Sequence, residues 1–142
     1  MIQIEQMKTV ALISPISATA NGTQSGTVDT QGYNHATILT ILDTAATNPT
    51  GLVLGDGSVT NSFTDIPAFI GDDTTTGFTI PDTDTDNPQI VRFEVDLTDL
   101  ERYLELVITA GATQVNSAVC ILSMGDTPQT IAGMGVSALV QS

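Results

Sequence analysis

The fold class is decided by the stretch Val91-Arg-Phe-Glu-Val-Asp-Leu97, in which apolar and charged residues alternate without a break. This period of two is typical of a β-strand with one buried face and one face in water. The segment 102–110 repeats the pattern, because Leu104, Leu106 and Ile108 alternate with mostly polar residues. Val107 lies on the polar side, so we expect partial cover there.

Two further segments, 36–42 and 117–124, are largely apolar and show no consistently polar face. Such a nearly continuous apolar run is typical of a strand that is covered on both sides. Weaker strand patterns occur at 8–14, 24–29, 51–55, 62–66 and 77–80. About eight or nine short strands separated by turn residues are typical of an antiparallel β-sandwich or barrel. We therefore predict an all-β fold in a single domain, residues 1–142.

Turn residues separate the predicted strands. Asn21-Gly22 predicts a tight hairpin, because both central positions of a type I′ turn need positive φ. Asp56-Gly57 predicts another turn.

Two segments stand apart from the strand pattern. Residues 71–88 carry five carboxylates and predict a long, exposed and mobile connection, whereas residues 128–142 are charge-poor.

Acidic side chains outnumber basic ones by 16 to 3, which gives a net charge of −13 over 142 residues. Nucleic-acid binding needs Lys and Arg at the phosphates, and Lys8, Arg92 and Arg102 are too few for a basic patch. The same shortage excludes binding to an anionic membrane surface. No apolar run approaches the length of a membrane-spanning helix. The apolar run 9–13 is too short for a signal peptide, so we expect it to belong to the mature fold.

Candidate catalytic groups are few. Cys120 is the single cysteine, and its aliphatic neighbours Val119 and Ile121 predict a buried, unreactive thiol. His35 is the single histidine, and neither an orienting partner nor a nucleophile lies near it in the sequence. The phenylalanines are expected to anchor the core rather than to bind sugar: Phe63, Phe69, Phe78 and Phe93. We therefore predict no catalytic residues, no cofactor and no enzymatic activity.

One acidic stretch has the start of a calcium-binding pattern. Asp82, Asp84 and Asp86 alternate, and alternate carboxylates can converge on one hard cation. The rest of the EF-hand pattern is missing, because Asn87 replaces the turn glycine and Phe93 replaces the bidentate glutamate. These three aspartates are therefore either a weak calcium site or a solvated acidic turn.

Three stretches in order resemble the small head-decoration, or cement, proteins of tailed bacteriophages. The first runs from Gly26-Thr-Val-Asp-Thr-Gln-Gly-Tyr33 into the apolar segment 36–42. The second runs from Leu52-Val-Leu-Gly-Asp-Gly-Ser58 to Ile66, and the third consists of 91–97, Arg102-Tyr-Leu and 117–122. Their order is similar to the family's Asp-x-x-Gly-Tyr turn, middle Ser/Asp-Asp-Gly turn and late Arg-Tyr-Leu strand. The resemblance covers residues 9–125 and departs from the family at Gly55-Asp-Gly-Ser58 and in the acidic segment 71–88.

The resemblance implies a jelly-roll β-sandwich that binds the outside of an assembled capsid and stabilises it without catalysis. The implied partners are the major capsid protein and other copies of the chain, commonly in a homotrimer. The implied location is the outer capsid surface of the virion.

Residue-level expectations accompany this reading. Tyr33 can cap one end of the sandwich with its ring buried and its hydroxyl wet. Arg102 is expected to pair with Asp99 or Glu101. The segments 8–20 and 128–142 combine apolar residues with almost no charge. We expect them either to contact the capsid or other subunits, or simply to complete the sandwich.

A second reading remains open at this point. A β-sandwich of this size also suits a ligand-binding module, such as an adhesin or a carbohydrate-binding domain. Such a module could depend on calcium through Asp82, Asp84 and Asp86.

Overall fold

The computed structural model describes residues 6–84 and 88–124. Within them the chain forms eight β-strands: β1 (Lys8–Ala18), β2 (Thr23–Asp29), β3 (His35–Leu42), β4 (Gly51–Val59), β5 (Ser62–Ile70), β6 (Gln89–Asp96), β7 (Tyr103–Thr109) and β8 (Gln114–Ser123). In the described part of the chain, no helix is long and apolar enough to cross a membrane.

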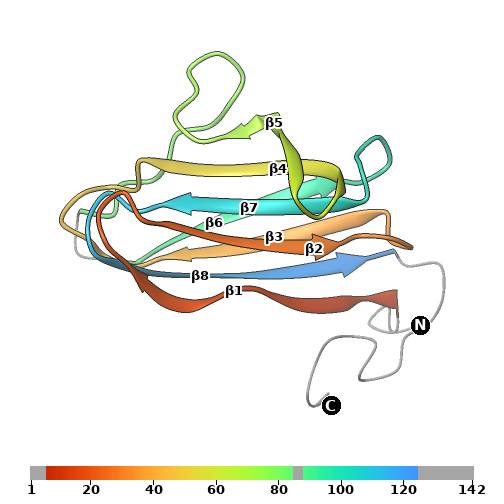
Figure 1. Ribbon diagram of the computed structural model, residues 1–142, viewed down its shortest axis with the longest axis horizontal. Coiled ribbons are helices and arrows are strands. Elements are labelled where there is room, and N and C mark those ends of the chain that lie inside the picture. Colours follow the sequence, from red (N-terminus) through yellow and green to blue (C-terminus); the bar gives the residue numbers. More distant parts are fainter. Residues whose placement is uncertain (1–5, 85–87, 125–142) are drawn as a thin grey trace.

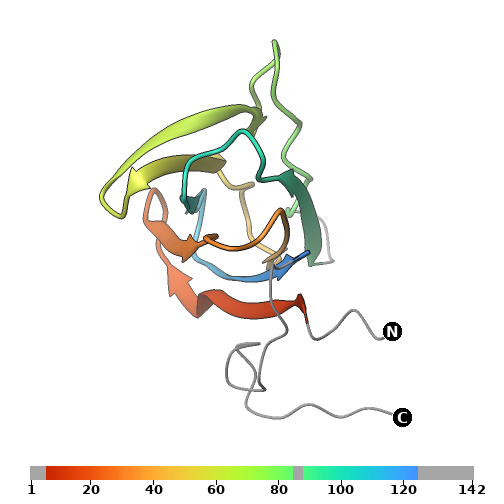
Figure 2. The same cartoon turned by 90° about the vertical axis from the view of Figure 1, so that its right-hand side faces the viewer.

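The strands form two antiparallel sheets of four, in the orders β1-β8-β3-β6 and β2-β7-β4-β5. Figure 1 shows the strands running along the long axis of the molecule, and Figure 2 shows the sandwich from one end of the strands. Every connection between successive strands passes from one sheet to the other, except the β4–β5 connection. This strand order is that of a jelly roll. The predicted all-β jelly-roll sandwich is therefore confirmed.

The core lies between the sheets and is built from alternate residues of the strands. β3 contributes Ile38 and Leu42, and β7 contributes Leu104, Leu106 and Ile108, all fully buried. Phe93 lies at one side of this core, and its ring meets those of Phe69 and Phe78 edge to face, with centroids 5.7 and 5.5 Å apart. Phe63 does not belong to the main core; it lies half-buried on β5 near Gly57 of β4.

The expectation that 36–42 and 117–124 are covered on both sides is wrong for the described residues. Ile41 on β3 and Val119 on β8 are 44% and 37% exposed. Their inward neighbours Leu42 and Cys120 are fully buried. One face of these strands therefore packs in the core, and the other is an aliphatic surface in solvent.

Two predicted turns are also corrected. Asn21 has a positive φ of 62°, but Asn21-Gly22 joins β1 and β2, which lie in different sheets and do not pair. It is an inter-sheet turn rather than a hairpin. Asp56-Gly57 lies inside β4, which continues to Val59 before the chain turns into β5.

The acidic segment is more ordered in its described part than predicted. No strand forms at 77–80; a single parallel bridge joins Gly71 to Phe78 instead. Ile80 and Thr83 are buried, so this connection adds side chains to the interior. The Asp72 carboxylate accepts a 2.8 Å hydrogen bond from the Ile80 backbone N–H, and the Asp73 carboxylate accepts one of 2.9 Å from that of Thr75. Carboxylates therefore fix the turns of this segment.

Candidate docking face

The outward side of the sheet β1-β8-β3-β6 carries many aliphatic side chains, interrupted by polar residues such as Ser117, which lies opposite Ile41. Register places Ile41 opposite Ile90, and Leu39 opposite Val119, which is in turn opposite Ala11. Ile90 is 67% exposed, the most of any large hydrophobic residue in the described part of the chain. We call this surface the docking face, and it consists of Ala11, Leu39, Ile41, Ile90, Val115, Val119 and Ile121.

The docking face is almost free of formal charge. Strands β3 and β8 contain no Asp, Glu, Lys or Arg, and β1 contains only Lys8. Charge appears only along the edge strand β6, where Arg92, Glu94 and Asp96 are exposed. Such a surface is exceptional in a chain of net charge −13. Contiguous exposed apolar patches of this kind mark interaction sites in soluble proteins.

The outward side of the other sheet is mixed, because the half-buried aliphatic residues Val107, Val53 and Ile70 lie opposite one another across β7, β4 and β5. Its strands present Thr27 and Asp29 on β2 and Glu105 on β7, in neighbouring register positions. Val107 is half-buried, so the partial cover expected at this position is present. The two outer faces of the sandwich therefore differ in chemistry, and the aliphatic one is the candidate contact surface.

Asp29 and Arg102 form an ion pair on this side of the sandwich. Asp29 belongs to the first stretch of the family resemblance and Arg102 to the third. Arg102 Nε and Nη2 donate to the two oxygens of Asp29 at 2.9 and 2.7 Å, and its guanidinium lies 5.0 Å from the Tyr103 ring centroid. The expected pairing with Asp99 or Glu101 is therefore wrong. Pairing of β2 with β7 sets Asp29 opposite Tyr103, so Arg102 is its neighbour across strands.

The hydrogen bond from Arg102 lowers the pKa of the Asp29 carboxyl, with a smaller opposing effect from burial. Tyr33 lies nearby in sequence, half-buried and packed against the core, and burial raises the pKa of its hydroxyl. Its backbone N–H donates to the Thr30 carbonyl at 3.1 Å. Gly32 just before it has a φ of 88°, a conformation that glycine adopts readily and that suits a sharp turn.

His35 has two partners that the sequence did not suggest. Its Nδ1 lies 3.4 Å from Ser123 Oγ, and its Nε2 lies 3.1 Å from Glu94 Oε2. Thr37 Oγ1 donates to the same Glu94 oxygen at 2.8 Å, and the other oxygen pairs with Arg92. The Thr37 hydrogen bond is the largest cause of the lowered pKa of Glu94.

This hydrogen-bonded group connects β8, β3 and β6 at one end of the docking face. Ser123 lies directly opposite His35 in register, although the two are far apart in sequence. The order hydroxyl, imidazole, carboxylate is also that of a nucleophile with its base. The Ser123 hydroxyl lies 3.4 Å from the His35 imidazole, and the three side chains link neighbouring strands.

Cys120 is fully buried on the inward side of β8, as predicted. Burial raises the pKa of its thiol to about 12. The thiol is therefore protonated at neutral pH, and the thiolate is the reactive form of cysteine.

Asp82 and Asp84, two of the calcium candidates, lie together beside Asn48. The Asp84 backbone N–H lies within hydrogen-bond distance of Asp82 Oδ1 at 3.1 Å and of Asn48 Oδ1 at 3.2 Å. The backbone hydrogen bond lowers the pKa of Asp82, while hydrogen bonding with Asp82 raises that of Asp84. Asp86 lies outside the described residues, which contain no cluster of three His, Cys, Asp or Glu side chains suited to a metal. Calcium binding here stays a prediction.

A buried polar cluster between the sheets has no counterpart in the sequence-based expectations. Asn116 Nδ2 donates to Gln24 Oε1 at 2.9 Å, and Gln114 Nε2 donates to the Asp43 carbonyl at 2.5 Å. Gln114 and Asn116 have the same strand parity as the core residues Cys120 and Leu122, which was the available signal. Among the described residues, Thr40 Oγ1 and Asn116 Oδ1 are buried without a hydrogen-bond partner.

A shallow open groove also runs along β1 and the start of β2. Ile13, Ile16, Thr23 and Gln24 are among its lining residues. The described residues that line it include no aromatic side chain. The stacking platform that sugars commonly use is therefore not part of this groove.

Comparison with known proteins yields no family. No protein-family model matches the chain, and no curated protein matches it. Among solved structures, it is similar to a carbohydrate-binding module of family CBM28 specific for non-crystalline cellulose, with 10% identity and a TM-score of 0.37 over 81% of this chain and 73% of that one.

Two enzymes show a similar degree of likeness. A family GH115 4-O-methyl-α-glucuronidase has 11% identity and a TM-score of 0.41 over 87% of this chain and 17% of its own. An exo-β-1,3-galactanase from Phanerochaete chrysosporium has 9% identity and a TM-score of 0.37 over 83% of this chain and 28% of its own.

Proposed function

We propose that the protein is a structural component of a tailed-bacteriophage virion that binds the outer capsid surface and stabilises the shell without catalysis. The sequence resemblance suggests the kind of partner, and the jelly-roll order agrees with the fold that this resemblance implies. The observation that carries the proposal is the docking face, because an aliphatic, charge-poor surface in so acidic a chain suits contact with another protein.

The small size of the docking face suits attachment through several linked copies, and the resemblance implies that these copies form a homotrimer. Four strands about 4.8 Å apart and eight residues long cover roughly 500 Å². A stable interface buries about 800 Å² on each partner, so one such face alone is a small contact. Linking three copies adds their contacts through effective concentration, which raises overall affinity without any new kind of contact. The major capsid protein and two further copies of the chain are therefore the proposed partners.

Mass spectrometry of purified virions from the source phage tests the proposal, together with immunogold labelling of intact particles. The chain is expected among the virion proteins, with label on the outer surface. Size-exclusion chromatography with light scattering is expected to give the mass of a trimer. Absence from virions would contradict the proposal. Glycan binding by a monomer on an array would instead favour the carbohydrate-binding alternative.

A matched pair of variants tests the role of the docking face. Val119→Asp places a charge in the middle of the face, whereas Val59→Asp places it on a somewhat more exposed valine of the other sheet, 48% exposed against 37%. Because an unpaired charge in an interface is costly, capsid binding by the first variant is expected to weaken at least about tenfold. The second variant is expected to bind normally. Equal binding by both would exclude this face as the contact.

A further inference from the structure

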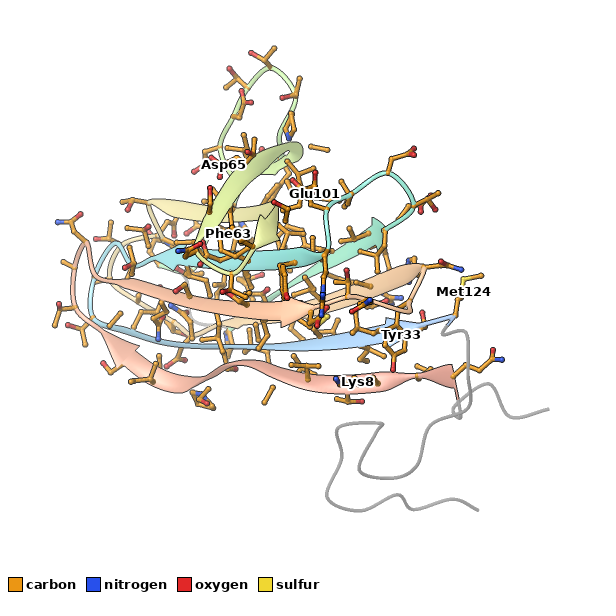
Figure 3. The ribbon with its side chains drawn as sticks, turned by 45° about the vertical axis from the view of Figure 1, so that its right-hand side comes forward. Lys8, Tyr33, Phe63, Asp65, Glu101 and Met124 are labelled. Carbon is orange, nitrogen blue, oxygen red and sulfur yellow. The ribbon has the colours of Figure 1, made fainter. Side chains whose placement is uncertain are left out.

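The edge strands of the two sheets differ in how well they are protected against further strand pairing. β1 begins at Lys8, contains Pro15 and shows two register shifts against β8 (Figure 3). β5 contains Pro67 and also shows two register shifts. β2 has Gly26 against the Leu12 carbonyl of β1, so its edge is covered there. Proline, charge, irregular register and cover all discourage pairing at a sheet edge.

β6 is the edge strand that lacks this protection in the described structure. It pairs with β3 in unbroken register over its whole length, from Gln89 to Asp96. It contains neither proline nor glycine. A regular edge of this kind is a template on which another extended chain can pair.

Three residues of β6 direct their backbone groups toward this open side. The Leu97 N–H donates to the Asn34 carbonyl at 3.0 Å, in continuation of the register between β3 and β6. Residues of an antiparallel strand face their partner strand alternately, so the residues that face away from β3 are Ile90, Arg92 and Glu94. Within residues 6–84 and 88–124, no hydrogen bond from another element reaches the backbone of these three residues.

An apolar pocket of about 230 Å³ opens beside the same edge. Its apolar lining comes from the end of β5, the connection that follows it, and β6: Ala68, Phe69, Phe78, Val91 and Phe93. Phe69 and Phe78 are half-buried, and both rings meet that of the buried Phe93 edge to face. Val91 and Phe93 lie on the inward side of β6. The inward side chains of a strand added at this edge would therefore enter the pocket.

The outward side of β6 carries a surplus of negative charge. Glu94 and Asp96 are exposed, and hydrogen bonds from Thr37 and Thr98, respectively, are the largest causes of their lowered pKa values. Both carboxylates are therefore ionised at neutral pH. Arg92 is the only basic side chain of β6, and it pairs with Glu94. In a chain of net charge −13, this edge favours a basic partner strand.

We propose that the edge of β6 binds an extended, basic peptide segment of another protein as a fifth strand of the sheet β1-β8-β3-β6. Its alternate apolar side chains enter the pocket beside Phe69 and Phe78, and its alternate Lys or Arg side chains lie opposite Glu94 and Asp96. A second copy of the chain is disfavoured, because it brings the same surplus of carboxylates. The site is separate from the docking face and does not depend on the identity of the particle. The predicted contacts of the segment 128–142 fall outside the described residues.

Hydrogen exchange measured by NMR on the full-length protein tests the proposal. The probe is a short synthetic peptide of alternating lysine and leucine, capped at both ends. When it saturates the site, the amides of Ile90, Arg92 and Glu94 are expected to exchange at least about tenfold more slowly, because they gain hydrogen bonds. The exposed amides at the outer edge of β1 are expected to keep their rates.

Two control peptides separate strand addition from charge attraction. The first has the same composition, with its lysines and leucines in separate blocks. The second is N-methylated at the lysine amides, which face β6 when the lysines lie opposite Glu94 and Asp96. Both are expected to bind at least about tenfold more weakly, because main-chain hydrogen bonds and the pockets for alternate side chains supply the affinity of an added strand.

A matched pair of variants tests the pocket. Ala68→Trp fills it from an exposed alanine, whereas Ala20→Trp places the same ring on an exposed alanine in the turn between β1 and β2. The first variant is expected to bind the alternating peptide at least about tenfold more weakly, because the pocket no longer admits a side chain. The second is expected to bind it normally. Slow exchange of the amides of Ile38 and Leu122 verifies that both variants are folded.

Four results would overturn the proposal. The first is no added protection of the three β6 amides with the alternating peptide at about 1 mM. The second is equal binding by either control peptide, because charge attraction alone would then explain it. The third is protection of these amides in the free protein, because another segment or copy would then already occupy the edge. The fourth is equal affinity of the Ala68→Trp and Ala20→Trp variants. None of these results depends on capsid binding.

Discussion

At the scale of single residues, the Asp29–Arg102 pair is the clearest electrostatic feature of the sheet β2-β7-β4-β5. Both side chains are more than 40% exposed, so solvent screens the pair and its contribution to stability is small. Its effect on titration is easier to measure. Because Arg102 lowers the pKa of Asp29, the pair stabilises the fold above the carboxyl's unfolded pKa. That contribution is lost as the pH falls through the lower, folded pKa.

We predict that Arg102→Gln raises the pKa of Asp29 toward its ordinary value. Carboxyl NMR titration of the wild type and the variant measures this directly. Asp96 is an internal control, because the side-chain hydrogen bond from Thr98 is the largest cause of its own lowered pKa. The Asp96 titration is expected to stay unchanged. An unchanged Asp29 titration would mean that Arg102 does not hold the carboxylate in solution.

Thr40 is a second residue whose chemistry leads to a prediction. Its hydroxyl is fully buried, and no described residue offers it a hydrogen bond. A buried unsatisfied polar group costs about 1–3 kcal/mol, so Thr40→Val is expected to raise the free energy of unfolding by about 1 kcal/mol. Thr83→Val is the matched control, because the equally buried Thr83 hydroxyl lies 3.4 Å from both Asn48 Oδ1 and Gln114 Nε2. Urea denaturation should show a higher free energy of unfolding for Thr40→Val and a lower one for Thr83→Val. A lower free energy of unfolding for Thr40→Val would reveal a partner such as bound water.

The side-chain partners of individual residues could not be predicted from the sequence. The neighbours of Arg102 in the chain suggested Asp99 or Glu101, yet strand pairing gives it Asp29. His35 gains Ser123 and Glu94 in the same way, from strands β8 and β6. Strand parity in the sequence tells which side of a sheet a residue occupies, but not which strand lies beside it. The burial of Cys120 needed only that parity and was predicted correctly.

At the scale of strands, β1 and β2 close one side of the sandwich through a close backbone approach. The register of β1 against β8 shifts between Ala11 and Ile13, so Leu12 lies at an irregularity in the strand. Gly26 of β2 faces it, and a Cβ at that position would overlap the Leu12 carbonyl oxygen. Glycine inside a strand often marks such an approach, although the period-two pattern alone does not show which strand approaches.

Gly26→Ala is therefore expected to destabilise the protein by about 3 kcal/mol, because a backbone oxygen cannot move aside as a flexible side chain can. Ser25→Ala, at the adjacent exposed position, is expected to change stability by less than about 0.5 kcal/mol. Chemical denaturation of both variants measures the difference. If Gly26→Ala were as stable as Ser25→Ala, β1 and β2 would be farther apart in solution than the structure places them.

At the scale of the whole molecule, the sequence predicted the class of fold well and the surfaces only in part. Alternation along 91–97 and 102–110 was enough for a sandwich, and the family resemblance added the jelly-roll order that the sheets display. The continuous apolar runs 36–42 and 117–124 were misread as covered on both sides. A sequence cannot distinguish a strand buried by neighbouring layers from a strand whose outer face is apolar and exposed to solvent. That ambiguity concealed the docking face.

The uneven charge of the molecule leads to the last prediction. Sixteen acidic side chains face only three basic ones, and the described structure brings Arg92 and Arg102 together with Glu94 and Asp29. The remaining carboxylates repel one another in the folded state more than in the expanded chain.

Raising NaCl from 10 mM to 1 M shortens the Debye length from about 30 Å to about 3 Å. We therefore expect the melting temperature to rise with salt by about 2–4 °C, which corresponds to roughly 1 kcal/mol. Sodium chloride rather than sulfate isolates screening, because sulfate also strengthens apolar burial. A variant with Asp65→Asn, Asp99→Asn and Glu101→Gln neutralises three exposed acids and should show a smaller rise. An equal rise in this variant, or a fall in the wild type, would mean that carboxylate repulsion does not limit the stability of the sandwich.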